Sequence, residues 1–196
     1  AFDTAAALGV AQLGHEPLSG ATATGTPATL TDPADVVEAV VTYRVSAIDR
    51  ADRRARVAYA LERRGGAWSV SAEDPVGAGA SAPWLGMPGA SVVRTANVVV
   101  AGTAGEQVLR THAATAQELR GPLAEAWPAM PETVLVLAPA TPREADRLLG
   151  RAPGGAPVAA TTEGPLAPDG TATGDRVVLD PDAQGRLTPA GRRVVL

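Results

Sequence analysis

Alternating apolar and polar residues predict antiparallel strands in the first half of the chain. Residues 36–48 (VVEAVVTYRVSAI) are rich in β-branched side chains and are long enough for a strand. Residues 56–72 predict a hairpin that turns at Arg64, Gly65 and Gly66. Its alternating apolar positions are Val57, Tyr59 and Leu61, then Trp68 and Val70 on the returning strand. We therefore expect a curved antiparallel sheet with one buried side.

The second half of the chain alternates strands with helices. Residues 91–101 (SVVRTANVVVA) and 134–138 predict strands on either side of a long helix. We expect Thr103 and Glu106 to form a capping box at the start of this helix. Pro122 is expected to kink the helix or to end its regular part. The apolar stripe of the helix comprises Val108, His112, Ala116, Leu119, Leu123 and Trp127.

Further helix starts follow towards the C-terminus. Thr141 is expected to cap a helix, with Pro142 in its first turn and Glu144 completing a capping box. Thr188 opens another helix, which ends on the apolar triplet of residues 194–196. Because short helices need support to persist, we interpret this last helix as an interrupted one.

The remaining segments predict short strands, loops and a boundary. Residues 158–163 and 176–180 predict strands, joined by a Gly/Pro-rich loop over 164–174, and residues 20–33 also predict a loop. Between Asp74 and Gly89 the apolar periodicity is lost, which favours a domain boundary there. We expect Trp84 to dock the linker that crosses this boundary.

Composition limits the classes of function. The net charge is −4 and all basic residues are Arg, so no basic stripe is present for nucleic acid. The Ala, Gly, Pro and Arg content is typical of a GC-rich bacterial genome. With three Trp, two Tyr and one Phe, the core must consist mainly of Val, Leu and Ala, and each Trp is expected to anchor packing. Arg50, Arg53, Arg54 and Arg56 alternate with Asp49 and Asp52, which predicts a solvated turn.

The sequence offers little catalytic chemistry. Cysteine is absent, so thiol nucleophiles, thiolate metal sites and disulfides are excluded. The two histidines, His15 and His112, lie far apart, and neither has a second ligand at helical spacing. We expect His112 to be a satisfied core or boundary residue. Asp180-Pro181-Asp182 follows a predicted strand, and a turn is a simpler interpretation than a catalytic role. No apolar run approaches the roughly 20 residues that span a bilayer.

The C-terminal run of residues 175–196 (DRVVLDPDAQGRLTPAGRRVVL) resembles the segment before the active-site helix of secreted bacterial zinc metallopeptidase-like proteins, of the gluzincin or peptidase-MA-like kind. Features in the order of that family also occur upstream. They are Ala67-Trp68, Pro83-Trp84, Ala138-Pro139 and Leu148-Leu149-Gly150.

The resemblance implies an α+β fold in two parts. A curved antiparallel roll, similar to nuclear transport factor 2 or cystatin, would occupy residues 1–75, followed by a linker over 76–90. Residues 91–196 would then form a small mixed-sheet α/β portion, the N-terminal part of a zincin-like peptidase domain. Such a roll normally begins with one or two helices, and only residues Phe2 to Gln12 are available for them here. An incomplete roll therefore stays open as an alternative.

The H-E-x-x-H motif of the family is absent from this sequence, so no residue is assigned to catalysis or to metal binding. The resemblance implies zinc and hydrolase activity for the full-length parent, secreted or at a bacterial cell surface, and an inactive chain here. One role carries over, that of an edge strand holding an extended peptide or protein. The residues in that place are Val158, Ala159, Ala160, Thr161 and Thr162.

Two other classes of function stay open. In the first alternative the chain is a self-standing module that binds a ligand or partner in the concave side of its roll. In the second it is a structural cell-surface protein that assembles through a strand edge. An edge strand without any ligand accounts equally well for residues 158–162. The substrate and the oligomeric state do not follow from the sequence.

Overall fold

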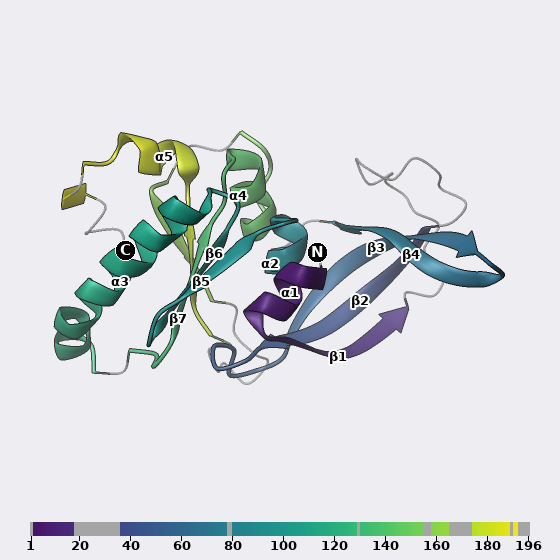
Figure 1. Cartoon of the computed structure of the whole chain (residues 1–196), viewed down its shortest axis with the longest axis horizontal. Helices are drawn as coiled ribbons and strands as arrows, with labels where there is room; N and C mark the ends of the chain where they lie inside the picture. The colour runs from purple at the N-terminus through teal and green to yellow at the C-terminus, as the bar shows by residue number, and fades with distance from the viewer. Residues whose placement is uncertain are drawn as a thin grey trace.

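The computed structural model describes residues 2–17, 36–77, 80–128, 130–154, 158–164, 174–188 and 190–191, with backbone alone for 2–4 and 12–17. These residues form a mixed α+β fold in which a curled antiparallel sheet, shaped like a half-barrel, lies beside a mixed sheet (Figure 1). This much of the expected fold class is confirmed. The loop predicted over residues 20–33 lies outside the described residues.

The first sheet has four antiparallel strands in the order β1-β2-β3-β4. Its strands are β1 (Val10–Pro17), β2 (Val36–Val45), β3 (Arg53–Arg64) and β4 (Ala67–Pro75). The hairpin turns at Gly65 (φ 58°) and Gly66 (φ 87°), where the left-handed backbone that a two-residue turn requires favours glycine. The hairpin predicted from the sequence is therefore confirmed.

The second sheet has five strands in the order β5-β6-β7-β9-β8. Strands β6, β7 and β9 are parallel, whereas β5 and β8 are antiparallel to their neighbours. Their bounds are β5 (Ser91–Arg94), β6 (Val98–Gly102), β7 (Val134–Ala138), β8 (Ala160–Glu163) and β9 (Arg176–Leu179). The single strand expected over residues 91–101 is wrong, because Val98 N–H donates to Thr95 Oγ1 (3.2 Å) in a local turn that reverses the chain.

Helices cover both faces of the second sheet. On one face α3 (Glu106–Ala126) packs through Leu109 against Val100 and Val136. The other face joins the first sheet in one core, to which the helices contribute Leu8 and Trp84. The remaining helices are α1 (Phe2–Leu8), α2 (Pro83–Gly86), α4 (Pro142–Leu149) and α5 (Pro181–Arg186). The expected division of the chain at residues 76–90 stays a prediction.

The three tryptophans differ in burial. Trp84 in α2 is 2% exposed and meets the Tyr43 ring edge-on, with 4.8 Å between ring centroids, so the expectation that it anchors packing is confirmed. Trp68 is 59% exposed and Trp127 50%, so the expectation that they anchor packing is wrong. Trp68 lies at the end of a hairpin that projects past the helices, and Trp127 follows the last turn of α3 (Figure 1).

The start and the proline of α3 differ from expectation. The N-cap is Gly105 and has no side-chain cap, so the capping box of Thr103 and Glu106 is wrong. The Thr103 hydroxyl instead donates to Glu144 Oε2 of α4 (2.8 Å), a partner distant in sequence. The helix also continues four residues past Pro122. Residues 121–128, around and after this proline, are exposed.

Three other residues near helix starts accept local capping hydrogen bonds. The predicted box at Thr141 is confirmed, since its hydroxyl accepts from Glu144 N–H (3.3 Å) and the Glu144 carboxylate accepts from Thr141 N–H (3.1 Å). The turn expected at Asp180 is instead the N-cap of α5, whose carboxylate accepts from Ala183 N–H (3.0 Å). Thr188 Oγ1 accepts from Gly191 N–H (3.1 Å), as a helix cap does, and residues 192–196 lie outside the described chain.

Candidate functional site

Strand β8 forms the outer edge of the second sheet, where the sequence placed an edge strand. Ala160, Thr161 and Thr162 lie within β8, and Val158 and Ala159 precede it. Among the described strands, β8 pairs only with β9. Val158 is 47% exposed. The backbone edge away from β9 is thus free of other described strands, and whether it binds a peptide stays a prediction.

The pairing decides which backbone groups of β8 point outward. Asp180 N–H donates to the Ala159 carbonyl (3.2 Å), so residue 159 faces β9. Because hydrogen-bonded and non-bonded pairs alternate along antiparallel strands, Thr161 also faces β9. The outward N–H and C=O groups therefore belong to Ala160 and Thr162. Since Gln184 Nε2 also donates to the Ala159 carbonyl (2.9 Å), both hydrogen bonds that this carbonyl accepts come from within the chain.

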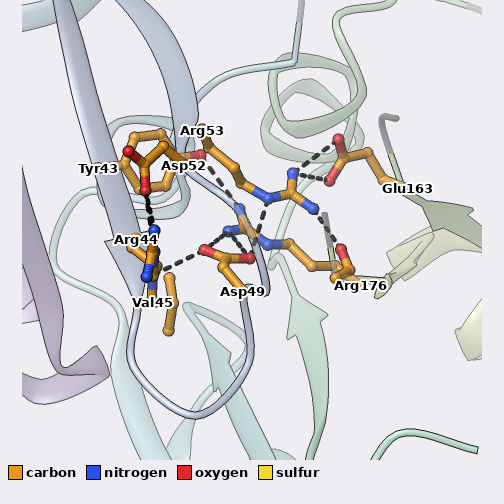
Figure 2. Close-up of polar contacts among 9 residues, drawn as sticks. Tyr43, Arg44, Val45, Asp49, Asp52, Arg53, Glu163 and Arg176 are labelled. Atoms are coloured by element: carbon orange, nitrogen blue, oxygen red, sulfur yellow. Dashed lines mark hydrogen bonds and ion pairs between the residues drawn. The ribbon is translucent and has the colours of Figure 1, made fainter. Parts of the chain in front are cut away.

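The end of β8 is held by an arginine from the first sheet. Arg53 Nη1 donates to both carboxylate oxygens of Glu163, at 3.0 and 2.7 Å (Figure 2). Arg53 also donates through Nε to Asp49 Oδ1 (3.0 Å) and through Nη2 to the Gly174 carbonyl. The side chains of Arg53 and Glu163 are only 5% and 15% exposed. This contact fixes β8 against the first sheet.

Asp49 lies at the centre of the same cluster. Its fully buried carboxylate accepts from Arg176 Nη2 at 2.8 and 2.7 Å and from Val45 N–H at 2.7 Å (Figure 2). Arg176 lies on β9 and also donates to the Tyr43 hydroxyl (3.3 Å). The cluster thus joins two guanidinium groups with two carboxylates and carries no net charge. Its geometry is that of a structural clamp between the sheets.

The clamp corrects one prediction from the sequence. Residues 49–56 were expected to form a solvated turn, which is wrong for Asp49 (8% exposed) and Arg53 (6% exposed). Arg50, Asp52, Arg54 and Arg56 are exposed. No local signal separates the two groups, because the partners Glu163 and Arg176 lie 110 and 127 residues away.

A cavity of about 290 Å³ opens where β7 and β9 end. Its lining is mainly apolar and includes Val108, His112, Ala138, Leu179, Pro181 and Gln184. Open α/β sheets bind ligands at the carboxyl ends of their parallel strands, which is where this cavity lies. His112 is 6% exposed, in agreement with the expected core or boundary histidine.

Gln184 in this cavity has a defined orientation. Its amide nitrogen Nε2 donates to the Ala159 carbonyl. Because a carbonyl oxygen can only accept a hydrogen bond, the Gln184 Oε1 atom cannot be the one that faces it. That oxygen is buried and has no hydrogen-bond partner among the residues that the structure describes. The cavity therefore combines apolar walls with one lining side chain, Gln184, whose amide oxygen is an unsatisfied acceptor.

One flank of α3 is left uncovered by the part of the chain that the structure describes. Thr95 Oγ1 donates to Gln117 Oε1 (2.7 Å), which places the Gln117 side of the helix over the β5–β6 turn. On the opposite flank Val108 is 43% exposed and Leu123 40%. This flank faces β7 and β9, where Val177 is partly exposed. No other described helix lies along α3 on this face.

A metal site does not arise from the described residues. Within these ranges no group of three His, Asp or Glu side chains converges. His112 belongs to the second sheet's helix α3, and the side chain of His15 in β1 lies outside the description. No helix in the described ranges has both the length and the apolarity needed to cross a bilayer.

Comparisons with models of protein families, with curated proteins and with solved structures find no match to this chain.

Proposed function

We propose that this chain is the non-catalytic N-terminal part of a secreted bacterial zinc-metallopeptidase-like protein, and that strand β8 holds an extended segment of its substrate or partner. The observation that carries the proposal is the outer edge of β8, which no other described strand pairs with and to which the backbone groups of Ala160 and Thr162 point. An extended peptide binds such an edge by adding a strand through main-chain hydrogen bonds.

The order of elements around β8 supports the kinship with zincins. In those folds an antiparallel edge strand comes just before the last strand that precedes the active-site helix. Here β8 is antiparallel to β9, and the hydroxyl of Thr188 caps a helical turn soon after β9. The uncovered flank of α3 beside β7 and β9 is a face on which a further helix would pack.

Zinc belongs to the parent protein in this proposal. The described residues do not fit the metal, since no three ligating side chains converge among them. We therefore assign no chemical step to this chain. Its contribution is to bind and orient a polypeptide.

The clamp supports binding by holding the edge rigid before a peptide arrives. Arg53 fixes the Glu163 carboxylate at one end of β8, and Gln184 and Asp180 fix the Ala159 carbonyl at the other. A strand that is already ordered loses less conformational entropy on binding.

Thr162→Pro tests the proposal. Proline removes the outward N–H of residue 162 and leaves the ladder to β9 intact, because proline is tolerated where an edge N–H faces solvent. Fluorescein-labelled β-casein, an unfolded protein, serves as the probe in an anisotropy titration. We expect an affinity about tenfold lower for Thr162→Pro, as one main-chain hydrogen bond and the fit of the added strand are lost.

Thr162→Val is the matched control, because it keeps the N–H and the shape of the side chain. It should bind the probe as the wild-type chain does. Equal affinities for the Pro and Val variants, with equal melting temperatures, would rule out β8 as the binding edge. Absence of binding by the wild-type chain would do the same.

A second candidate is a small-molecule site in the cavity near His112, as expected of a self-standing binding module. Its place at the carboxyl ends of parallel strands and the unpaired Gln184 Oε1 favour it. A fluorinated fragment library, screened by ¹⁹F NMR, should give hits that Val108→Trp abolishes by filling the cavity. Hits unaffected by that substitution, or none, would contradict this candidate.

A further inference from the structure

Small side chains create the cavity at the carboxyl ends of β7 and β9. Ala104 follows β6, Ala138 ends β7 and Ala140 comes soon after it, and all three line the cavity. Its volume is about 290 Å³. An apolar cavity of about 150 Å³ is enough to hold benzene. The space therefore fits a ring that carries one or two substituents.

The walls of this cavity carry no carboxylate or guanidinium group. None of the described residues that line it is Asp, Glu or Arg. An ionised ligand would lose its hydration here without gaining an opposite charge. The lining therefore favours a neutral and mainly apolar ligand.

Gln184 offers such a ligand a polar contact. His112 and Gln184 are the described lining residues with polar side chains, and they are 6% and 9% exposed. His112 already takes part in an interaction within the chain. Gln184 Oε1 is buried and has no hydrogen-bond partner among the described residues. Because a buried acceptor without a donor is unfavourable, a ligand donor that reaches this oxygen would stabilise the complex.

The Gln184 amide can turn towards the cavity without leaving another group unsatisfied. Its Oε1 is closed off from solvent in the chain alone, so a ligand reaches this atom only when the amide plane rotates. The last torsion of a glutamine side chain has a broad energy minimum, which permits this rotation. The Ala159 carbonyl accepts from Gln184 Nε2 (2.9 Å) and also from Asp180 N–H (3.2 Å), and it keeps the second bond.

We propose that the cavity binds a small neutral ligand with an apolar ring and one hydrogen-bond donor, as in a phenol, and that the donor binds Gln184 Oε1. This inference rests on the second candidate function, a small-molecule site in this cavity, and adds the chemistry of the ligand. The ring lies against the apolar side chains of Val108 and Leu179, and its hydroxyl group donates to Gln184.

A matched pair of probes tests the donor. In para-fluorophenol and para-fluoroanisole the fluorinated ring is the same, but the methyl ether of the second cannot donate a hydrogen bond. A ¹⁹F NMR titration with each probe, up to millimolar concentrations, measures its affinity for the whole chain. We expect the phenol to bind about tenfold more tightly, because it satisfies a buried acceptor. Val108→Trp should abolish binding of both probes by filling the cavity.

Gln184→Met assigns this preference to one side chain. It keeps the length of the side chain and removes the acceptor, so the two probes should bind with similar affinities. Gln107→Met is the matched control, because it makes the same change at an exposed position of α3, and it should keep the tenfold preference. In the wild-type chain, the side-chain amide signal of Gln184 in a ¹⁵N–¹H spectrum should shift with the phenol and not with the ether.

The outcomes separate this inference from the site on which it rests. Equal affinities of the two probes for the wild type, both lost in Val108→Trp, would keep the small-molecule site and overturn the donor. A preference that persists in folded Gln184→Met would place the acceptor elsewhere and overturn the role of Gln184. If Gln184→Met does not fold, an unchanged amide signal at saturation with the phenol overturns it instead. Absence of binding by either probe would overturn both the inference and the second candidate function.

Discussion

Replacing Asp49 by alanine should destabilise the protein strongly, because it leaves two buried arginines without their shared carboxylate. The side chain of Asp49 is fully buried and accepts hydrogen bonds from Arg53, Arg176 and Val45 N–H. Arg53 keeps Glu163 after the change, but Arg176, with a side chain 2% exposed, keeps only the Tyr43 hydroxyl. Removing one partner of a buried ion pair costs about 3–5 kcal/mol.

Urea unfolding measures this loss. A chain of this size is expected to have an m-value of about 2.5 kcal/mol/M, so the midpoint should fall by about 1.5 M. Asp52→Ala is the matched control, three residues away, because Asp52 forms an ion pair with Arg44 in which the side chains are 46% and 45% exposed. An exposed pair is worth less than about 1 kcal/mol, so that midpoint should fall by less than about 0.4 M.

The double variant Asp49→Leu with Arg176→Met distinguishes two quantities. One is the stability lost when a buried arginine loses its carboxylate partner, and the other is the net stability that the ion pair contributes. Apolar replacement of both partners is often close to neutral, so this variant should be more stable than Asp49→Ala. Equal midpoint shifts for Asp49→Ala and Asp52→Ala would refute the reasoning, since they would mean that burial does not decide the cost.

Four further predictions concern other groups. Burial raises the pKa of Glu73 in the folded state. The native chain therefore loses stability as the pH rises from the ordinary carboxyl pKa to this raised pKa. Glu73→Gln should therefore melt higher than the wild type at pH 7, and equally at a pH below the ordinary carboxyl pKa of about 4.3. The same change should lower the pKa of Tyr59, which burial and then the Glu73 charge raise to about 12, in an ultraviolet titration. Thr141→Ala should cost about 1 kcal/mol by removing the cap that binds Glu144 N–H, while Thr111→Ala on the exposed side of α3 should cost much less. Titration calorimetry should detect no stoichiometric zinc binding, and micromolar binding would contradict the absence of a ligand set.

The elements that the sequence predicted correctly are those whose causes lie within a few residues. The turn at Gly65 and Gly66 depends on two adjacent glycines, and the start of α4 depends on Thr141 and Glu144. The edge position of β8 agrees with the place implied by the resemblance, although no composition or periodicity distinguishes an edge strand from a central one.

The errors occurred where a local pattern competed with a distant contact or with solvent. The Thr103 hydroxyl was expected to cap α3 and instead binds Glu144 in α4. Trp68 was expected to be buried, but its hairpin extends beyond the covering helices. In both cases the local pattern was real, and the arrangement of neighbouring elements determined the outcome.

The sequence by itself determined the hairpin turn, the capped start of α4, and the strands β2 to β4 and β7 to β9, because backbone conformation and capping depend on neighbouring residues. Only the tertiary structure decided which charges are buried. Asp49 and Arg53 look like the exposed charges around them, and they meet Glu163 and Arg176 only after two sheets pack together. The free energy of an ion pair depends on its distance and on its exclusion from water, and both quantities belong to the folded chain.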